Sequence, residues 1–226
     1  MPALRSASFL IVAFATIDDH LVTQLAERRL PLVLVNRRTS GIHGSVVVDD
    51  EGGSVQAVRH LIDLGHRRIG FVGLEPETDT AQRRERGYRI AMETGGHQID
   101  EAWIVRAAPD EAGGREAIAR ILGVRPEARP TGSFVASLLG AIGVLAGIHE
   151  AGLAVPGDLS LIAFNDHPLA AHLSPPLTTI RMPNYRMGQE AVRMLLAAVD
   201  GKPVRDFMVD DKPELVIRAS TALPAQ

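Results

Sequence analysis

The chain has 226 residues, with 24 basic and 27 acidic side chains, a formal net charge of −3 and 46% hydrophobic residues. These values are typical of a globular protein with one or two cores, and no apolar run reaches the roughly 20 residues that a membrane-spanning helix needs. The near-neutral charge and the low aromatic content (Phe 6, Tyr 2, Trp 1) disfavour autonomous DNA or RNA binding, while the absence of cysteine excludes disulfides, thiolate metal ligands and cysteine nucleophiles.

Short β-branched apolar runs alternate with longer amphipathic segments along the chain, a pattern typical of parallel strands covered by helices. The predicted fold class is therefore α/β. Strands are predicted at residues 9–14, 32–35, 45–48, 68–72, 103–106, 132–136, 159–164, 206–209 and 215–218. Helices are predicted at 19–28, 51–64, 80–94, 111–122, 139–151 and 185–200, with Gly65, Gly95-Gly96 and Gly152 as left-handed residues after three of them.

Two segments allow more than one interpretation. Residues 9–15 resemble the apolar core of a signal peptide, but Asp18-Asp19 supplies a helix start directly afterwards, which favours a buried strand. Residues 165–179 show neither helical nor strand periodicity, and a loop of that length inside an α/β unit is usually functional or a crossover.

Polar side chains follow most of the predicted strands. Ligands of open parallel sheets bind beyond the carboxyl ends of the strands, and amides, carboxylates and guanidinium groups there suit a sugar or similar polyol. The candidates are Asn36-Arg37-Arg38, Asp49-Asp50-Glu51, residues 75–80, Ser137 and Asn165-Asp166-His167.

Several candidates have structural alternatives. Asp49, Asp50 and Glu51 precede a predicted helix and are expected to cap it. Arg84 belongs to a run of arginines along one helix, and such runs are usually solvated. Trp103 is expected in the core or at a strand edge, with stacking on a sugar as the alternative.

The sequence carries little that indicates catalysis. Ser137 lacks the Gly-x-Ser-x-Gly pattern of a nucleophile, His167 and His172 do not have the spacing of a metal site, and residues 70–73 lack the full glycine pattern of a nucleotide loop. The sequence predicts a binding protein without a metal or cofactor, and not an enzyme.

Seven stretches together resemble, in order and spacing, the effector-binding core of the lactose-repressor/galactose-repressor (LacI/GalR) family of transcription regulators. The likeness runs from about Ser8 to Thr221. Its motifs are residues 31–37, 47–53, 64–73 (with Gly65-His66-Arg67), 84–88, 134–137, 155–160 and 173–180 (with Pro175-Pro176-Leu177-Thr178-Thr179).

The resemblance implies a two-lobed, periplasmic-binding-protein-like type I fold whose N-lobe is truncated at its start. The expected lobes are residues 1–48 with 182–213 (partial N-lobe) and 49–181 with 214–226 (C-lobe). A helix-turn-helix domain is expected to be missing from this chain, so contact with DNA is expected only through that missing part.

The resemblance also implies which residues bind an effector in the cleft between the lobes. They are Asn36, Thr80, Arg84, Ser137, Asn165 and Asp166. Arg84, three residues before Gly87, is expected to give two hydrogen bonds to hydroxyls or a carboxylate.

The resemblance implies that the chain senses a small sugar-like effector as part of a cytoplasmic transcription regulator. The regulator is expected to act by ligand-dependent cleft closure and to form a homodimer. It is not expected to bind membranes. The small residues of helix 140–151 fit either a dimer contact or close packing on the chain's own sheet. The alternative function is a periplasmic solute-binding protein of a transporter, which shares the fold.

Overall fold

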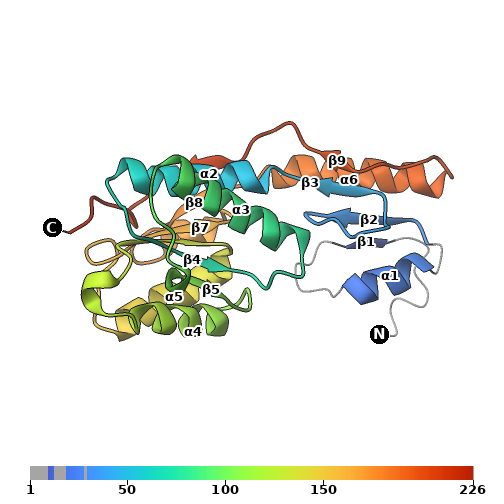
Figure 1. The fold of residues 1–226 in the computed structure, drawn as a ribbon. Coiled ribbons are helices and arrows are strands. Elements are labelled where there is room, and N and C mark those ends of the chain that lie inside the picture. The colour runs from blue at the N-terminus through green and yellow to red at the C-terminus, as the bar shows by residue number, and fades with distance from the viewer. Residues whose placement is uncertain (1–9, 13–18, 28–29, 226) are drawn as a thin grey trace. The chain divides into compact units, whose positions relative to one another are not determined.

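The computed structural model describes residues 10–12, 19–27 and 30–225, and these form two compact units. Unit 1 consists of residues 1–49, 78–80 and 183–212, and unit 2 of residues 50–77, 81–182 and 213–226. Each unit is a sheet with helices packed on it (Figure 1). The predicted α/β class is confirmed.

Unit 1 contains a parallel sheet with the strand order β1-β2-β3-β9 among the described residues. Its strands are β1 (Leu10–Val12), β2 (Leu32–Val35), β3 (Ser45–Val47) and β9 (Phe207–Met208), and its helices are α1 (Asp19–Glu27) and α6 (Asn184–Val199). The carboxylate of Asp206 accepts hydrogen bonds from the backbone N–H groups of Gly44 and Ser45, which fixes the segment before β9 against β3.

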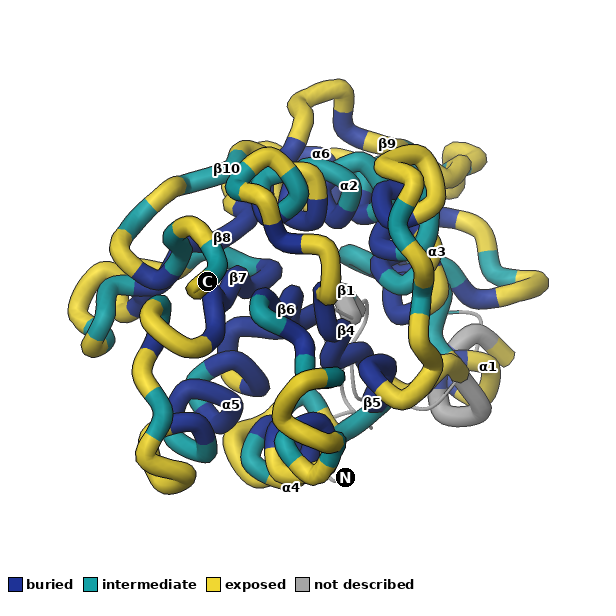
Figure 2. The backbone as a smooth tube through the Cα atoms, turned by 60° about the vertical axis from the view of Figure 1, so that its left-hand side comes forward, coloured by how far each residue is buried: buried dark blue, intermediate teal, exposed yellow. Residues whose placement is uncertain are grey.

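Unit 2 contains a sheet with the order β10-β8-β7-β6-β4-β5, parallel except for β10. Its strands are β4 (Ile69–Gly73), β5 (Ile104–Arg106), β6 (Gly132–Val135), β7 (Ser160–Phe164), β8 (Thr178–Arg181) and β10 (Glu214–Val216). The helices are α2 (Asp50–Asp63), α3 (Asp79–Thr94, from Ala81 on), α4 (Glu111–Leu122) and α5 (Leu138–Glu150), with short 3-10 turns at Glu101–Trp103, Pro126–Ala128 and Pro168–His172. Strands β4, β6 and β7 are buried along their whole length, and exposed residues gather on the surrounding helices and loops (Figure 2).

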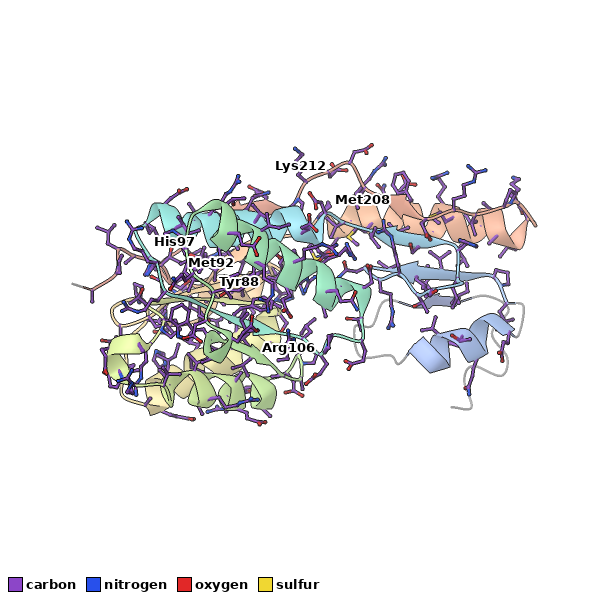
Figure 3. The ribbon with its side chains drawn as sticks, viewed as in Figure 1. Tyr88, Met92, His97, Arg106, Met208 and Lys212 are labelled. Carbon is purple, nitrogen blue, oxygen red and sulfur yellow. The ribbon has the colours of Figure 1, made fainter. Side chains whose placement is uncertain are left out.

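Side-chain alternation along the strands of unit 2 separates two cores. Phe71, Phe134 and Phe164 lie on one face, where Phe71 stacks on Tyr88 of α3 with ring centroids 5.0 Å apart. Tyr88 projects from α3 into this core (Figure 3), and its hydroxyl donates a hydrogen bond of 2.8 Å to the carbonyl of Ile69. The aliphatic residues of the opposite face, Val72 and Val135 among them, pack against α4 and α5.

Helix α5 packs closely on helix α4, and glycines make this possible. A Cβ on Gly114 would overlap the backbone oxygen of Gly140, and a Cβ on Gly143 would overlap that of Glu111. The small residues of α5 therefore serve a helix–helix contact inside unit 2, which neither of the two expectations for this helix had specified.

One sequence prediction was wrong and another is made precise. Residues 165–179 were predicted to lack regular structure, yet they include a 3-10 turn and the start of β8, whose Thr178 and Thr179 are fully buried. Trp103 was expected in the core or at a strand edge, and the core prediction is confirmed: it is 7% exposed and its indole N–H donates to the carbonyl of Ala128. It ends the 3-10 turn directly before β5, so the strand begins one residue later than predicted. Within the residues that the structure describes, no helix has the length and apolarity to span a membrane.

Candidate functional site

Three of the predicted effector residues meet at one edge of the unit 2 sheet. Because β6 and β7 are parallel neighbours, Ser137 after β6 and Asn165 after β7 follow the same carboxyl edge. Arg84 reaches this edge from α3: its Nη1 donates a 2.6 Å hydrogen bond to the carbonyl of Ala136. Its guanidinium carbon lies 3.9 Å from the centroid of the Phe164 ring at the end of β7.

The guanidinium of Arg84 is buried and ion-paired. Its Nε donates a 2.8 Å hydrogen bond to Oδ1 of Asp50, and Arg83 Nη1 lies 2.8 Å from Oδ2 of the same carboxylate. Burial lowers the pKa of Arg84 and Asp50 acts against this, so the guanidinium stays charged at neutral pH. Asp50 occupies the Nε edge of Arg84, and Nη2 faces the sulfur of Met182 at 3.8 Å. The two hydrogen bonds that Arg84 was expected to give a ligand would therefore have to come from its remaining guanidinium hydrogens.

Asp50 was expected to cap a helix, and sequence reasoning missed its role as the partner of Arg84. The pairing depends on Gly87, one helical turn after Arg84, because a Cβ there would overlap the backbone oxygen of Glu51 and lie 2.7 Å from Cβ of Ser54. Glycine lets α3 approach the first turn of α2 closely enough for both arginines to reach the carboxylate. The spacing Arg84-x-x-Gly87 was the only sequence signal of this contact.

Two asparagines share an unusual conformation. Asn36 directly follows β2 in unit 1 and Asn165 directly follows β7 in unit 2, and their φ angles of 59° and 74° lie in the left-handed region. The side-chain Oδ1 of each is buried and accepts no hydrogen bond from any residue that the structure describes. A buried acceptor without a donor costs folding free energy, and a bound molecule that donates a hydrogen bond would offset this cost.

The hydroxyls of Thr80 and Ser137 already have backbone partners. Thr80 is buried and donates to the carbonyl of Asn36, which connects the first turn of α3 to the segment after β2. Ser137 is the N-cap of α5, where its Oγ accepts a 3.0 Å hydrogen bond from the N–H of Gly140. The Ser137 proton remains available to an outside acceptor, because capping uses only a lone pair.

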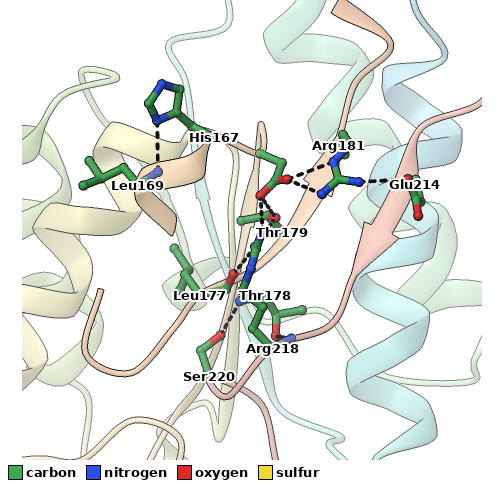
Figure 4. A network of polar contacts seen from close by, with 10 residues as sticks. His167, Leu169, Leu177, Thr178, Thr179, Arg181, Glu214, Arg218 and Ser220 are labelled. Atoms are coloured by element: carbon green, nitrogen blue, oxygen red, sulfur yellow. Dashed lines mark hydrogen bonds and ion pairs between the residues drawn. The ribbon is translucent and has the colours of Figure 1, made fainter. Parts of the chain in front are cut away.

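Asp166 accepts hydrogen bonds from side chains of the chain itself, those of Thr179, Arg181 and Arg218, which Figure 4 labels. Its Oδ1 accepts from Thr179 at 2.7 Å and Arg218 at 2.8 Å, and its Oδ2 accepts from Arg181 at 2.9 Å. Burial alone would raise the pKa of Asp166, but these hydrogen bonds outweigh it and hold the pKa below its ordinary value. The carboxylate thus fastens the loop after β7, including Asn165, to β8 and the segment after β10.

The comparisons agree with this architecture. A family profile described as a periplasmic binding protein-like domain matches residues 58–221. The structure of a LacI family transcriptional regulator from Mycobacterium smegmatis is 33% identical, with a TM-score of 0.92 over 97% of this chain and 81% of that one. The chain belongs to the LacI/GalR family. The predicted periplasmic-binding-protein-like architecture is thereby confirmed.

Other family members extend the comparison. The transcriptional regulator GalR of Escherichia coli is 32% identical over 218 residues, which cover 96% of this chain and 63% of GalR. A solved complex of the transcriptional regulator CelR with cellobiose is 27% identical, with a TM-score of 0.86 over 97% of this chain and 67% of that one. The chain spans between 60% and 66% of the length of the first curated relatives that it matches. These relatives are named as transcriptional regulators or repressors.

Proposed function

We propose that this chain is the effector-sensing part of a LacI-type transcription regulator that binds a small, uncharged, sugar-like molecule. The observation that carries the proposal is the pair of buried amide oxygens on Asn36 and Asn165. A sugar has several hydroxyl donors, and each orphan acceptor would gain a hydrogen bond when such a donor binds. The CelR complex with cellobiose supports this choice of ligand class.

Within unit 2, the proposed binding residues are Asn165, Arg84 and Ser137. Asn165 would accept from a ligand hydroxyl, Ser137 would donate to a ligand oxygen, and Arg84 would present its remaining guanidinium hydrogens. Asp50 already occupies the Nε edge of Arg84, so a two-point grip on an anion through that edge is not open, which supports the choice of a neutral ligand. Asp166 is proposed to act indirectly, by fixing the loop that carries Asn165.

Within unit 1, we propose Asn36 and Thr80 as ligand-binding residues. In the mechanism that the family likeness suggests, units 1 and 2 correspond to the two lobes, and each contributes ligand-binding residues of its own. Binding would then shift the population toward a closed state, by an amount set by the difference in ligand affinity between the two states. We also propose that the whole protein controls transcription, forms a homodimer and is located in the cytoplasm.

A thermal-shift screen of the 226-residue chain against neutral sugars, nucleobases and inorganic phosphate tests the ligand class. A ligand present at a hundred times its dissociation constant should stabilise the chain by about 2.7 kcal/mol. We expect a neutral sugar to raise the melting temperature and phosphate to leave it unchanged. Stabilisation by phosphate alone would contradict the proposal.

Two variants of Asn165 locate the site. Asn165→Gly removes the amide but accepts the left-handed φ without strain, so the fold should persist while the ligand shift disappears. Asn165→Asp keeps acceptor oxygens and should retain part of the shift. If Asn165→Gly responded to the sugar like the unmodified chain, the ligand would bind elsewhere.

The transporter alternative is not favoured, because the relatives that the comparisons name are transcriptional regulators. Cell fractionation of the full-length protein separates the two functions. We expect recovery in the cytoplasmic fraction, and periplasmic recovery would support the transporter function instead.

A further inference from the structure

The chain passes between the two units more than once, and three residues of unit 2 stand directly at such passages. Asp50 and Pro213 are each the first residue of unit 2 after a stretch of unit 1, and Met182 is the last residue of unit 2 before one. We call Asp50, Met182 and Pro213 the crossing residues. Asp50 begins α2, Met182 follows β8 and Pro213 precedes β10, so they belong to three different segments. Whatever holds them in place also holds the points at which unit 2 continues into unit 1.

One side chain holds two of the crossing residues, and it is Arg84 of α3. Its Nε donates to Oδ1 of Asp50 at 2.8 Å, and its Nη2 faces the sulfur of Met182 at 3.8 Å. All three residues are buried, with Asp50 0%, Arg84 2% and Met182 7% exposed. The guanidinium therefore connects two crossing residues that are far apart in the sequence.

The third crossing residue is reached through the ring of Phe164. The guanidinium carbon of Arg84 lies 3.9 Å from the centroid of this ring. A Cβ on Gly53 would lie 3.0 Å from the ring and 3.1 Å from Cβ of Pro213, so the ring, the first turn of α2 and Pro213 are closely packed. Gln56 also donates a 3.1 Å hydrogen bond to the carbonyl of Pro213. Arg84 thus belongs to one packed group that contains all three crossing residues.

The hydrogen bonds of Arg84 are not equally strong. The carboxylate of Asp50 and the carbonyl of Ala136 are good acceptors, whereas the thioether sulfur of Met182 is a weak one. An oxygen of a bound sugar that accepts from Nη2 would replace the sulfur at little cost, while the other two hydrogen bonds persist. Met182 is therefore the crossing residue whose contact with Arg84 a ligand can exchange.

We propose that Arg84 couples ligand binding in unit 2 to the crossing residues, with Met182 as the positioning residue whose contact a ligand oxygen replaces. Without ligand, Arg84 holds Asp50 and Met182 together. With ligand, it keeps Asp50 and gives up Met182. The ligand step rests on the proposed function, whereas the role of Arg84 in the ligand-free chain does not.

Hydrogen–deuterium exchange of the ligand-free 226-residue chain tests the first half of the proposal. Arg84→Lys keeps a positive charge beside Asp50, but an ammonium group cannot donate in the fixed directions of a guanidinium. We expect the backbone amides of residues 48–52 and 181–184 to exchange about threefold faster or more in this variant, because both segments lose a common anchor.

Arg89→Lys is the matched control for this exchange experiment. Arg89 lies on the same helix and pairs with Glu85 and Glu101, which are not crossing residues. This variant should leave the exchange of residues 181–184 unchanged. In Arg84→Lys, strands β4 and β6 should keep their slow exchange; an equal rise there would assign to Arg84 a general role in stability and refute the specific coupling.

Met182→Leu tests the ligand step, with a neutral sugar that stabilises the unmodified chain as the probe. Leucine fills a similar volume but offers no acceptor, so a ligand oxygen at Nη2 would have no sulfur contact to replace. We expect the variant to bind the sugar about threefold more tightly, whereas a residue that serves only packing would leave the affinity unchanged or lower it. Met187→Leu makes the same exchange at a buried position of α6 in unit 1 and should not change the affinity.

The two experiments separate the two proposals. If no sugar stabilises the unmodified chain, the proposed function fails, and the exchange of Arg84→Lys still decides whether Arg84 anchors the crossing residues. Unchanged exchange at residues 181–184 in Arg84→Lys would overturn the coupling. A Met182→Leu variant that binds the sugar no more tightly than Met187→Leu would overturn the role of Met182.

Discussion

The substitution Asp50→Asn should be among the most destabilising changes of a single charge in unit 2. The Asp50 carboxylate is 0% exposed, accepts from Arg84 at 2.8 Å and pairs with Arg83 at 2.8 Å, and those side chains are 3% and 6% exposed. Removing one partner of a buried ion pair leaves the other charge without compensation and typically costs about 3–5 kcal/mol. Two guanidinium groups are affected here, so we expect a loss of about 4 kcal/mol in the free energy of unfolding.

Glu51→Gln is the matched control, because it makes the same carboxylate-to-amide change in the same turn of α2. Glu51 pairs with Arg86 of the same neighbouring helix, but these side chains are 37% and 57% exposed. Exposed pairs contribute about 0–1 kcal/mol, and the loss of charge near the helix N-terminus is common to both variants. The difference between the variants therefore isolates the effect of burial.

Urea denaturation followed by tryptophan fluorescence measures both variants. Trp103 is the only tryptophan in the sequence and is buried in unit 2, so its emission reports the unfolding of that unit. We expect a large drop in midpoint for Asp50→Asn and a small, salt-sensitive drop for Glu51→Gln. Equal losses in the two variants would refute the view that burial makes the Asp50 pair important.

Three further changes test separate parts of the structure. In urea denaturation, Gly143→Ala should cost about 2 kcal/mol or more because its Cβ would overlap the oxygen of Glu111. Gly188→Ala in α6 should instead stabilise by up to about 1 kcal/mol, because a Cβ there meets no described atom within 4 Å and alanine is the better helix former; equal effects would contradict the α4–α5 packing. Asp166→Asn should flatten the loss of stability below about pH 4, because the pKa of Asp166 is lowered in the folded state and its contribution is lost as the carboxylate is protonated; melting temperatures from pH 2.5 to 6 check this. Burial lowers the pKa of His66, so the unfolded chain binds the extra proton and stability should fall as the pH drops below about 6.5; His66→Asn should reduce this slope, and an unchanged slope would assign it to other groups.

The sequence predicted most elements within one or two residues, because apolar periodicity and glycine stops are local signals. Gly65, Gly96 and Gly152 do have positive φ angles, as expected after a helix. Strand β8 was missed because its buried residues include Thr178 and Thr179, which do not look like core. Their hydrogen-bond partners, Ser220 and Arg218, come from about 40 residues later in the chain, and no local pattern contains that information.

In the candidate site too, the sequence predicts what depends on local signals and misses what depends on contacts between distant residues. The positions of Ser137 and Asn165 follow from where strands end, which the sequence predicts well. The hydrogen-bond partners of the site's side chains are harder to predict. Ser137 caps α5 within its own turn, which is a local contact, whereas Arg84 and Asp166 bind residues that are 34 and 52 positions away in the sequence. Sequence reasoning therefore located the strand-end groups and could not tell which of them are already bound by the protein.

Which side chains the protein itself already holds in place affects how tightly a ligand would bind. The ion pair with Asp50 and the ring of Phe164 fix Arg84 before any ligand arrives, and Asp166 fixes the loop that carries Asn165. Because these groups are ordered by folding, a ligand would lose less entropy in ordering them, which favours affinity. It follows that Asp50→Asn should weaken the proposed effector binding as well as stability, even though Asp50 need not touch the ligand. Glu51→Gln should leave both nearly unchanged, and if it weakened binding as much as Asp50→Asn, pre-organisation by the buried pair would not be the reason.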